Sequence, residues 1–248
     1  ADCSTPRSLL RSDSLAGTAS RYLGGPLGDG GKGQRRRQRF GWGDMTTVSH
    51  HAGGVLRHRT AIRRGDISRP VRAALDAGLI SVSTTVFDYG CGHGGDVRRL
   101  RDLGIQADGW DPHFEPVTPR LEADVVNLGF VLNVIEDRGE REEVLRASWA
   151  LSNEVLLVSA RTLAESPERG RAYRDGLLTS RSTFQKYFDH VELMNFVGGT
   201  LSQEPVSVEH GIVAVFRSPQ ARHDFIASRF RRRTRCARVS RADRLYDE

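Results

Sequence analysis

The sequence is poor in cysteine and has no long apolar run. Its three cysteines, Cys3, Cys91 and Cys236, lie far apart and form no C-x-x-C pair. This spacing argues against a disulfide framework and a zinc site, and it suits a reducing cytoplasm. No apolar stretch approaches the roughly 20 residues needed to cross a bilayer, and no apolar signal-peptide segment is seen at the N-terminus. We therefore expect a cytoplasmic protein without membrane contact and without a structural metal.

The middle of the chain also lacks excess positive charge. Residues 45–221 hold 20 Lys/Arg and 23 acids, a net of −3. Residues 1–44 hold eight Lys/Arg and four acids, and residues 222–248 hold nine and four, so the basic character of the chain (net +6) belongs to its two ends. A core that binds nucleic acid usually shows the opposite distribution. Any contact with DNA is therefore expected through the basic tails.

The composition divides the chain into four parts. Residues 1–44 hold nine of the 26 glycines and an arginine-rich run but no periodic apolar pattern, which predicts a disordered extension. A basic arm that touches nucleic acid is the functional alternative for this part. We expect a covering segment at 45–82, a ligand-binding domain at 83–218 and a basic C-terminal tail at 219–248.

The most informative stretch is 86–96, where an apolar strand runs into an acid and then into four glycines. Glycine permits a tight turn and lets a ligand approach backbone N–H groups. Gly90, Gly92 and Gly95 fit the dinucleotide pattern G-x-G-x-x-G. Asp88 with Gly90, Gly92 and Gly94 fits the D-x-G-x-G-x-G loop of class I S-adenosylmethionine (SAM) methyltransferases.

Asp88 favours the second pattern. A carboxylate before the loop would repel a pyrophosphate, whereas SAM carries an ammonium and a sulfonium that attract it. Asp111 follows Gly90 by 21 residues, a spacing typical of an acid that binds ribose hydroxyls at the end of the next strand. Asp111 fits NAD as well as SAM, so an NAD-binding oxidoreductase remains an alternative.

Strands alternate with helices along the chain, which predicts a parallel, doubly wound sheet. Two antiparallel strands are expected to close it. Only 12 residues separate Asp111 from Asp124, so we expect the fold to be shortened between its second and fourth strands, without an assignable adenine contact. The expected strands are 85–88, 105–110, the first half of 123–137, 154–159, 205–208 and 211–216. The expected helices are 68–79, 96–103, 140–152 and 183–201, with a long surface loop at 162–182.

Several segments together resemble the methyltransferases associated with DNA phosphorothioation, over about residues 55–235. The glycine loop is generic to class I methyltransferases, but the combined set is more specific. The segments are His58-Arg59-Thr60-Ala61-Ile62-Arg63-Arg64, Phe87-Asp88-Tyr89-Gly90-Cys91-Gly92, Asp108-Gly109-Trp110-Asp111-Pro112, Ala123-Asp124-Val125-Val126-Asn127-Leu128-Gly129, Asn133-Val134-Ile135-Glu136-Asp137, Val158-Ser159-Ala160-Arg161 and Thr183-Phe184-Gln185-Lys186.

The resemblance implies a Rossmann-like α/β fold, SAM as cofactor and a link to DNA modification. Carried over to this chain, Asp88, Gly90, Gly92 and Gly94 would hold the methionine end of SAM, and Asp111 its ribose. The segment from Asn127 through Leu128 to Phe130 would face the methyl group.

The acceptor is not indicated by any motif. The segment after the fourth strand reads Asn127-Leu128-Gly129-Phe130, without the (D/N)-P-P-(Y/F/W) element of DNA amino-methyltransferases or the Pro-Cys of cytosine C5 enzymes. A SAM-binding partner without catalysis is therefore a second alternative. Catalytic residues and oligomeric state are not assigned; the candidate bases are His93, His113, Glu136 and Asp137.

Overall fold

The computed structural model describes residues 55–63, 65–166 and 170–235, with side chains described as far as residue 229. The predicted extension at 1–44, the first part of the covering segment and the end of the basic tail lie outside these described residues. None of the helices in the described ranges is both long and apolar enough to cross a membrane.

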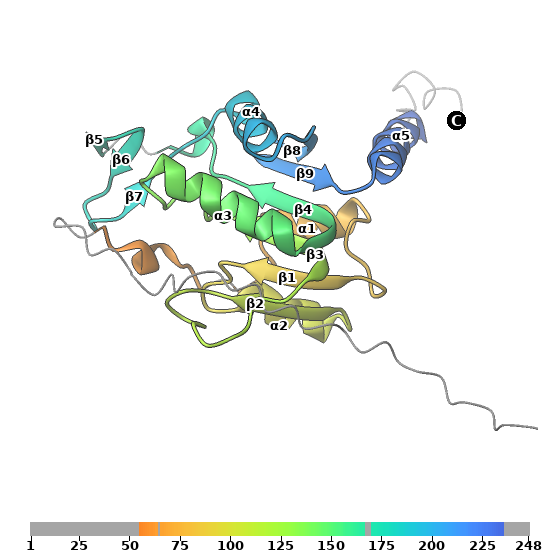
Figure 1. The fold of residues 1–248 in the computed structure, drawn as a ribbon, viewed down its shortest axis with the longest axis horizontal. Coiled ribbons are helices and arrows are strands. Elements are labelled where there is room, and N and C mark those ends of the chain that lie inside the picture. The colour runs from red at the N-terminus through yellow and green to blue at the C-terminus, as the bar shows by residue number, and fades with distance from the viewer. Residues whose placement is uncertain (1–54, 64, 167–169, 236–248) are drawn as a thin grey trace, which may run out of the picture. The chain divides into compact units, whose positions relative to one another are not determined.

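A six-stranded sheet forms the centre of the domain, with the strand order β2-β1-β3-β4-β9-β8 (Figure 1). The first four strands pair in parallel, β9 pairs antiparallel with β4, and β8 pairs antiparallel with β9. This arrangement confirms the predicted α/β fold with antiparallel closing strands. The bounds are β1 Thr85–Tyr89, β2 Gln106–Trp110, β3 Ala123–Gly129, β4 Ser152–Ser159, β8 Val206–Glu209 and β9 Ile212–Phe216.

Helices cover both faces of this sheet (Figure 1). α1 (Arg69–Asp76), α2 (Gly95–Asp102) and α5 (Pro219–Arg235) share one apolar cluster with side chains such as Val86 of β1 and Leu157 of β4. We call this side the α1 face. α3 (Arg138–Leu151) and α4 (His190–Leu201) share the other cluster, and we call that side the α3 face. Successive residues of a strand point to opposite faces, so each strand contributes to both clusters.

The segment between β2 and β3 is short, as predicted. Residues 112–122 contain neither a helix nor a strand of the sheet, and Asp111 forms an isolated bridge with Glu115. β2 is consequently an edge strand. The parallel strands β1 to β4 all end on the same side, which we call the carboxyl edge, because parallel strands bring their C-terminal ends together.

Two predictions between β4 and β8 are wrong. The expected loop at 162–182 contains the 3₁₀ turn Leu163–Glu165 and the strands β5 (Arg171–Tyr173) and β6 (Gly176–Leu178), which join β7 (Phe184–Gln185) in a three-stranded antiparallel sheet. The expected helix at 183–201 begins at His190. Asp189 caps it by accepting from the backbone N–H of Val191 and Glu192, and Glu192 completes a capping box.

Buried helix faces differ in part from the predicted ones. On α3, the spacing of Val144, Ala147, Ser148 and Leu151 predicts one buried row. Ser148 is buried, but the other three are only partly buried, and Arg141 and Leu145 are buried instead. The spacing of Val97, Leu100 and Leu103 predicts one buried side for α2; Val97 and Leu100 are buried, but Leu103, the C-cap, is 52% exposed. Residues 219–235, expected within a basic tail, form α5, and its Phe225 packs against Phe216 of β9 at a ring distance of 5.2 Å.

Candidate cofactor site

The glycine loop, residues 90–95, joins β1 to α2 at the carboxyl edge. Gly90 and Gly92 have φ of +86° and +54°, and Gly94 has φ of +66° at the N-cap of α2. These left-handed conformations favour glycine because other residues place Cβ against their own backbone. The N–H groups of Gly90 and Cys91 both donate to the carbonyl of Trp110, at 2.7 and 3.1 Å. The loop therefore turns directly over the end of β2.

Asp88 lies one residue before the end of β1 and is buried, with 5% exposure. Strand alternation puts its side chain on the α1 face, and in the sheet it is paired with Asn127 of β3. The side-chain amide of Asn127 donates to Asp88 Oδ1 at 2.8 Å. A buried carboxylate with an amide partner thus lies immediately below the glycine loop.

Asp111 follows β2 and links two turns. Its Oδ2 accepts from the N–H of Gly92 at 3.0 Å. Its Oδ1 accepts from the N–H of His113 at 2.9 Å and of Phe114 at 3.0 Å. Asp111 therefore holds the glycine loop to the segment after β2, and a ribose would meet a carboxylate whose direction is already fixed.

The remaining predicted site residues, Asn127 and Leu128, point to opposite sides of the sheet. Asn127 is 2% exposed beside Asp88, whereas Leu128 is fully buried in the cluster on the α3 face, so only its backbone is available to a ligand in this conformation. Phe130, two residues later, has φ of +61° and its N–H donates to the carbonyl of Ser159. A bulky residue in this region is strained, and such strain is found most often at functional sites.

The four candidate bases have different surroundings. Asp137 is the N-cap of α3, where it accepts from the N–H of Glu140 and pairs with Arg174 at 2.9 Å. Glu136 pairs with Arg57, also at 2.9 Å. The rings of His93 and His113 both lie against Phe114, with centroid distances of 4.1 and 4.7 Å.

A feature that the sequence did not indicate is a segment we call the strap, residues 56–61, which includes the 3₁₀ turn Arg57–Thr60. Arg57 binds Glu140 through two nitrogens and Glu136 through a third contact. Burial alone would lower the pKa of the Arg57 guanidinium, but the hydrogen bonds from Glu140 and Glu136 outweigh burial and raise that pKa above its ordinary value. The strap is thereby fixed to the beginning of α3.

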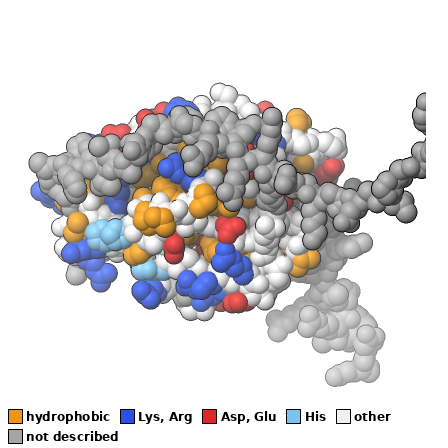
Figure 2. All heavy atoms as spheres, turned by 60° about the horizontal axis from the view of Figure 1, so that its bottom comes forward, with side chains coloured by type: hydrophobic (Ala, Val, Ile, Leu, Met, Phe, Trp, Pro, Cys, Tyr) orange, Lys and Arg blue, Asp and Glu red, His pale blue; other side chains and the backbone are white. Residues whose placement is uncertain are grey.

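Three further contacts extend the strap along the carboxyl edge. The N–H of Leu56 donates to the carbonyl of Ser182, and His58 stacks on His113 with ring centroids 4.3 Å apart. A Cβ added to Gly92 would lie 3.4 Å from Ala61 Cβ, so the strap touches the glycine loop. Figure 2 shows histidine side chains near one end of the face that carries β2 and α2.

Cys91 occupies the loop but is a poor nucleophile. Burial, followed by the negative charges of Asp88, Asp111 and Glu115, raises the pKa of its thiol to about 12. The thiol is therefore protonated at neutral pH. A Cβ added to Gly109 of β2 would lie 2.9 Å from Cys91 Cβ, which shows how closely this side chain packs.

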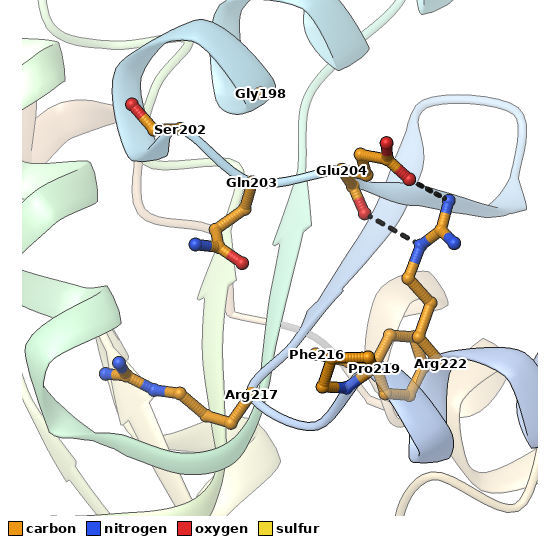
Figure 3. A pocket seen from close by; sticks show the side chains of 8 residues that line it. All are labelled: Gly198, Ser202, Gln203, Glu204, Phe216, Arg217, Pro219 and Arg222. Carbon is orange, nitrogen blue, oxygen red and sulfur yellow. Dashed lines mark hydrogen bonds and ion pairs between the residues drawn. The ribbon is translucent and has the colours of Figure 1, made fainter.

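A separate hollow of about 360 Å³ lies at the opposite edge of the sheet, where β4 begins and β9 ends (Figure 3). Its arginines are already engaged: Arg222 binds Glu204 at 2.8 Å, and Arg217 donates to Ser152 O and lies over the Trp149 ring. None of the predicted site residues lines this hollow.

Among known proteins, this chain is similar to solved structures of methyltransferases. No protein-family model matches the chain, and no curated protein matches it. The solved structures include magnesium protoporphyrin IX methyltransferase from Synechocystis PCC 6803 with bound S-adenosylhomocysteine (SAH), at 13% identity over 65% of this chain and 93% of that chain, with a TM-score of 0.42.

Another is the sugar N-methyltransferase KedS8 from Streptoalloteichus sp ATCC 53650, at 13% identity over 71% of this chain and 98% of that chain, with a TM-score of 0.47. A third is 1,6-didemethyltoxoflavin-N1-methyltransferase from Burkholderia thailandensis with bound 1,6-didemethyltoxoflavin and SAH, at 14% identity over 66% of this chain and 79% of that chain, with a TM-score of 0.43. At such identities and TM-scores, activity has to be argued from the residues of this chain.

Proposed function

We propose that this chain is a SAM-dependent methyltransferase. The observation that carries the proposal is a buried carboxylate, Asp88, at the end of a central parallel strand directly below a loop of three left-handed glycines. Ligands of open α/β sheets bind at this edge, outside the carboxyl ends of the strands. The combination fits a nucleoside ligand that carries positive charge.

The charges near the loop argue against a dinucleotide. Asp88 lies directly below the loop, and its negative charge helps to raise the pKa of Cys91. A pyrophosphate would have to bind next to this carboxylate, whereas the sulfonium and ammonium of SAM are attracted to it. An NAD-linked oxidoreductase is therefore the weaker alternative.

Methyl transfer from SAM is an in-line displacement on an activated carbon. The contribution of the chain is to hold and align the reactants, which by itself can supply much of the rate enhancement. Asp88 and the glycine loop hold the cationic end, and Asp111 holds the ribose. Glu136 and Asp137 are already paired with arginines. His93 and His113 are thus the better candidates to accept a proton from the methyl acceptor.

The binding test compares two acids on neighbouring strands. We expect calorimetry to detect SAM and SAH but not NAD, and Asp88→Asn to weaken SAH binding about tenfold or more, since it removes a buried charge next to the ligand. Asp108→Asn is the matched control, because Asp108 lies on β2 and pairs with Arg101 near the surface. NAD binding without SAH binding would exclude the proposal.

The link to DNA modification is a finer proposal that rests on the sequence resemblance. We propose that the acceptor belongs to a DNA-modification system, and the test is transfer of a radiolabelled methyl group to DNA, RNA or metabolites of a lysate. Transfer to metabolites alone would exclude the link to DNA. Tight SAM binding without transfer to any of them would favour a non-catalytic SAM-binding partner, which the missing acceptor motif makes the second candidate function.

A further inference from the structure

A buried arginine near the beginning of α3 lacks part of its hydrogen bonding. The side chain of Arg141 is only 2% exposed. Its Nη2 binds Oδ2 of Asp175, but its Nε and Nη1 have no partner among the described residues. Buried polar atoms are nearly always satisfied, and a cation is disfavoured at the positive N-terminal end of a helix. A purely structural role therefore explains Arg141 poorly.

Asp175, the partner of this arginine, is a carboxylate that can leave it. Tyr173 pairs with Gly176, so Arg174 and Asp175 form a two-residue turn between β5 and β6. A Cβ added to Gly176 would lie 2.6 Å from the Phe184 ring, so the hairpin is held on β7 by close packing. The side chain of Asp175 is 43% exposed. Its carboxylate can therefore turn into solvent while the three-stranded sheet stays in place.

A second cation approaches the same oxygen of Asp175. Lys186 Nζ lies 3.6 Å from Oδ2, the atom that the arginine also binds. The side chain of Lys186 is 10% exposed, and its other acidic partner is Glu192, at 2.7 Å. The acids just before α3 and in its first turn are already bound by Arg57 and Arg174. Asp175 is thus the anion that the buried arginine and the lysine share.

This pair of cations lies beside the segment that follows β3. Asn133, in this segment, accepts from the N–H of Lys186 at 2.8 Å and donates through its side chain to the carbonyl of Lys186. Val131, two residues earlier, lies against the glycine loop, because a Cβ added to Gly90 would overlap its Cγ2. Two residues of chain span at most about 7 Å. One short segment therefore joins the loop proposed to hold the cofactor to the two cations.

We propose that Arg141 and Lys186 bind an anionic group of the methyl acceptor, a carboxylate or a phosphate, and that Asp175 occupies this site when the acceptor is absent. The inference rests on the proposed function and assigns the acceptor to the class of anionic compounds. The free Nε and Nη1 flank the nitrogen that Asp175 binds, so Arg141 can form the paired hydrogen bonds that a carboxylate or phosphate accepts. The anion anchors the acceptor and is not itself methylated.

Inorganic phosphate tests the site without knowledge of the acceptor. In the wild type Asp175 competes with phosphate, so calorimetry should show weak binding. Asp175→Asn removes this competitor, and its affinity for phosphate should be about tenfold higher or more, as expected for hydrogen bonds to a charged group. Asparagine is favoured in turns, so this variant should fold. Chloride at the same ionic strength corrects both measurements for the screening of charges.

Two further variants assign the gain in affinity to the buried arginine. In Arg141→Gln/Asp175→Asn both charges are absent, and the affinity for phosphate should return to that of the wild type. Asp66→Asn is the matched control, because it also removes a carboxylate from an arginine. Its partner Arg72 is 53% exposed and is solvated without the carboxylate, so the affinity for phosphate should not change.

The anionic group of the acceptor is tested with the wild-type protein. The product of methyl transfer to the components of a lysate, labelled with a radioactive methyl group, should be retained on an anion-exchange resin. Alkaline phosphatase releases a phosphate monoester from the resin, nuclease degrades a nucleic acid, and a carboxylate resists both treatments. These treatments therefore identify which anionic group the acceptor carries.

Three results would overturn the inference alone: equal affinity of the wild type and Asp175→Asn for phosphate, a gain that persists in the double variant, or a labelled product that passes through the resin. The proposed function fails separately, if the wild type binds neither SAM nor SAH, whatever its affinity for phosphate.

Discussion

The carboxylates of the carboxyl edge differ in what they already bind, and their roles follow from that. The backbone N–H of Glu140, and then the side chain of Arg174, lower the pKa of Asp137 below its ordinary value. Asp137 therefore serves as the cap of α3 and is ill suited to take up a proton. Asp111 accepts from three backbone N–H groups and shapes the loop. In the sequence these acids look alike, since one partner of each, Arg174 for Asp137 and Gly92 for Asp111, comes from a distant segment.

The thiol of Cys91 should be almost inert in the folded protein. Its pKa of about 12 leaves roughly a thousandfold less thiolate at pH 8 than a free cysteine has, and the thiolate is the reactive form. We expect iodoacetamide to modify Cys91 much more slowly in the native protein than in urea. Mass spectrometry of the peptide containing Cys91 measures both rates. Similar rates would show that burial and the neighbouring carboxylates do not suppress the thiolate.

His190 should make the fold sensitive to mild acid. Its Nδ1 accepts from the N–H of Gly211, and its Nε2 lies 3.0 Å from Ser207 Oγ. Burial, followed by the nearby His210, lowers the pKa of His190 below its ordinary value of 6.5, and Asp189 only partly opposes this. The folded state thus favours neutral imidazole, so the stabilisation is present above about pH 6.5 and is lost as the pH falls through the lowered pKa.

Urea unfolding at pH 7.5 and 5.5 measures this effect. The wild type should lose more stability between the two pH values than His190→Gln, which cannot take up the proton. His223→Gln is the control, since His223 is exposed on α5 and its replacement should keep the wild-type pH dependence. If His190→Gln loses as much stability as the wild type, the titrating group is another one.

At the scale of elements, the shape of the glycine loop depends on one close approach. Gly90 has φ of +86°, and a Cβ there would overlap Val131 Cγ2 in the segment after β3. Gly90→Ala should therefore destabilise the fold by more than about 1 kcal/mol and abolish SAH binding, because both the backbone and Val131 must shift. Urea unfolding and calorimetry measure the two effects.

Gly199→Ala is the control for this substitution. Gly199 lies within α4, and a Cβ added there meets no atom within 4 Å. Alanine in a helix loses less backbone entropy on folding, so this variant should be more stable by about 0.5–1 kcal/mol. A Gly90→Ala protein as stable as the wild type would contradict this prediction, because it would show that Val131 can move away from residue 90 with no loss of folding free energy.

The sequence predicted the elements whose signals are local. The turn into α2 was indicated by Gly90 to Gly95 after an apolar strand. The helix α1 was indicated by Ser68 and Pro70 before an apolar helical face, and the short connection into β3 by the small distance from Asp111 to Asp124. The helix at 183–201 was predicted wrongly because Phe184, Tyr187 and Phe188 are spaced as on a helix. The capping box of Asp189 and Glu192 was a local signal that could have corrected its beginning.

Other features depend on distant partners and could not be predicted. β7 forms because Gln185 pairs with Leu177, and because the N–H of Lys186 donates to the carbonyl of Asn133 at 2.8 Å. Arg141 is buried on α3 because Asp175, in the turn between β5 and β6, binds it. The contact between Asp88 and Asn127 likewise required the register of two strands.

At the scale of the whole domain, the strap joins parts that are far apart in the sequence. It contacts Ser182 beyond β6, the first turn of α3 through Arg57, the segment after β2 through His58, and the glycine loop through Ala61. A ligand bound at the glycine loop would lie next to this segment, since Ala61 contacts Gly92. The strap should therefore limit how fast the ligand leaves.

Arg57→Gln tests this role of the strap. The substitution removes the charge that binds Glu136 and Glu140, so SAH should dissociate about three- to tenfold faster, as expected for the loss of a partly buried ion pair. Amide hydrogen exchange at residues 56–61 should increase in the same variant, because the strap opens more often. Arg72→Gln is the control, since Arg72 pairs with Asp66 on the surface. Faster exchange of the strap with unchanged SAH dissociation would mean that the strap stabilises the carboxyl edge without covering the ligand.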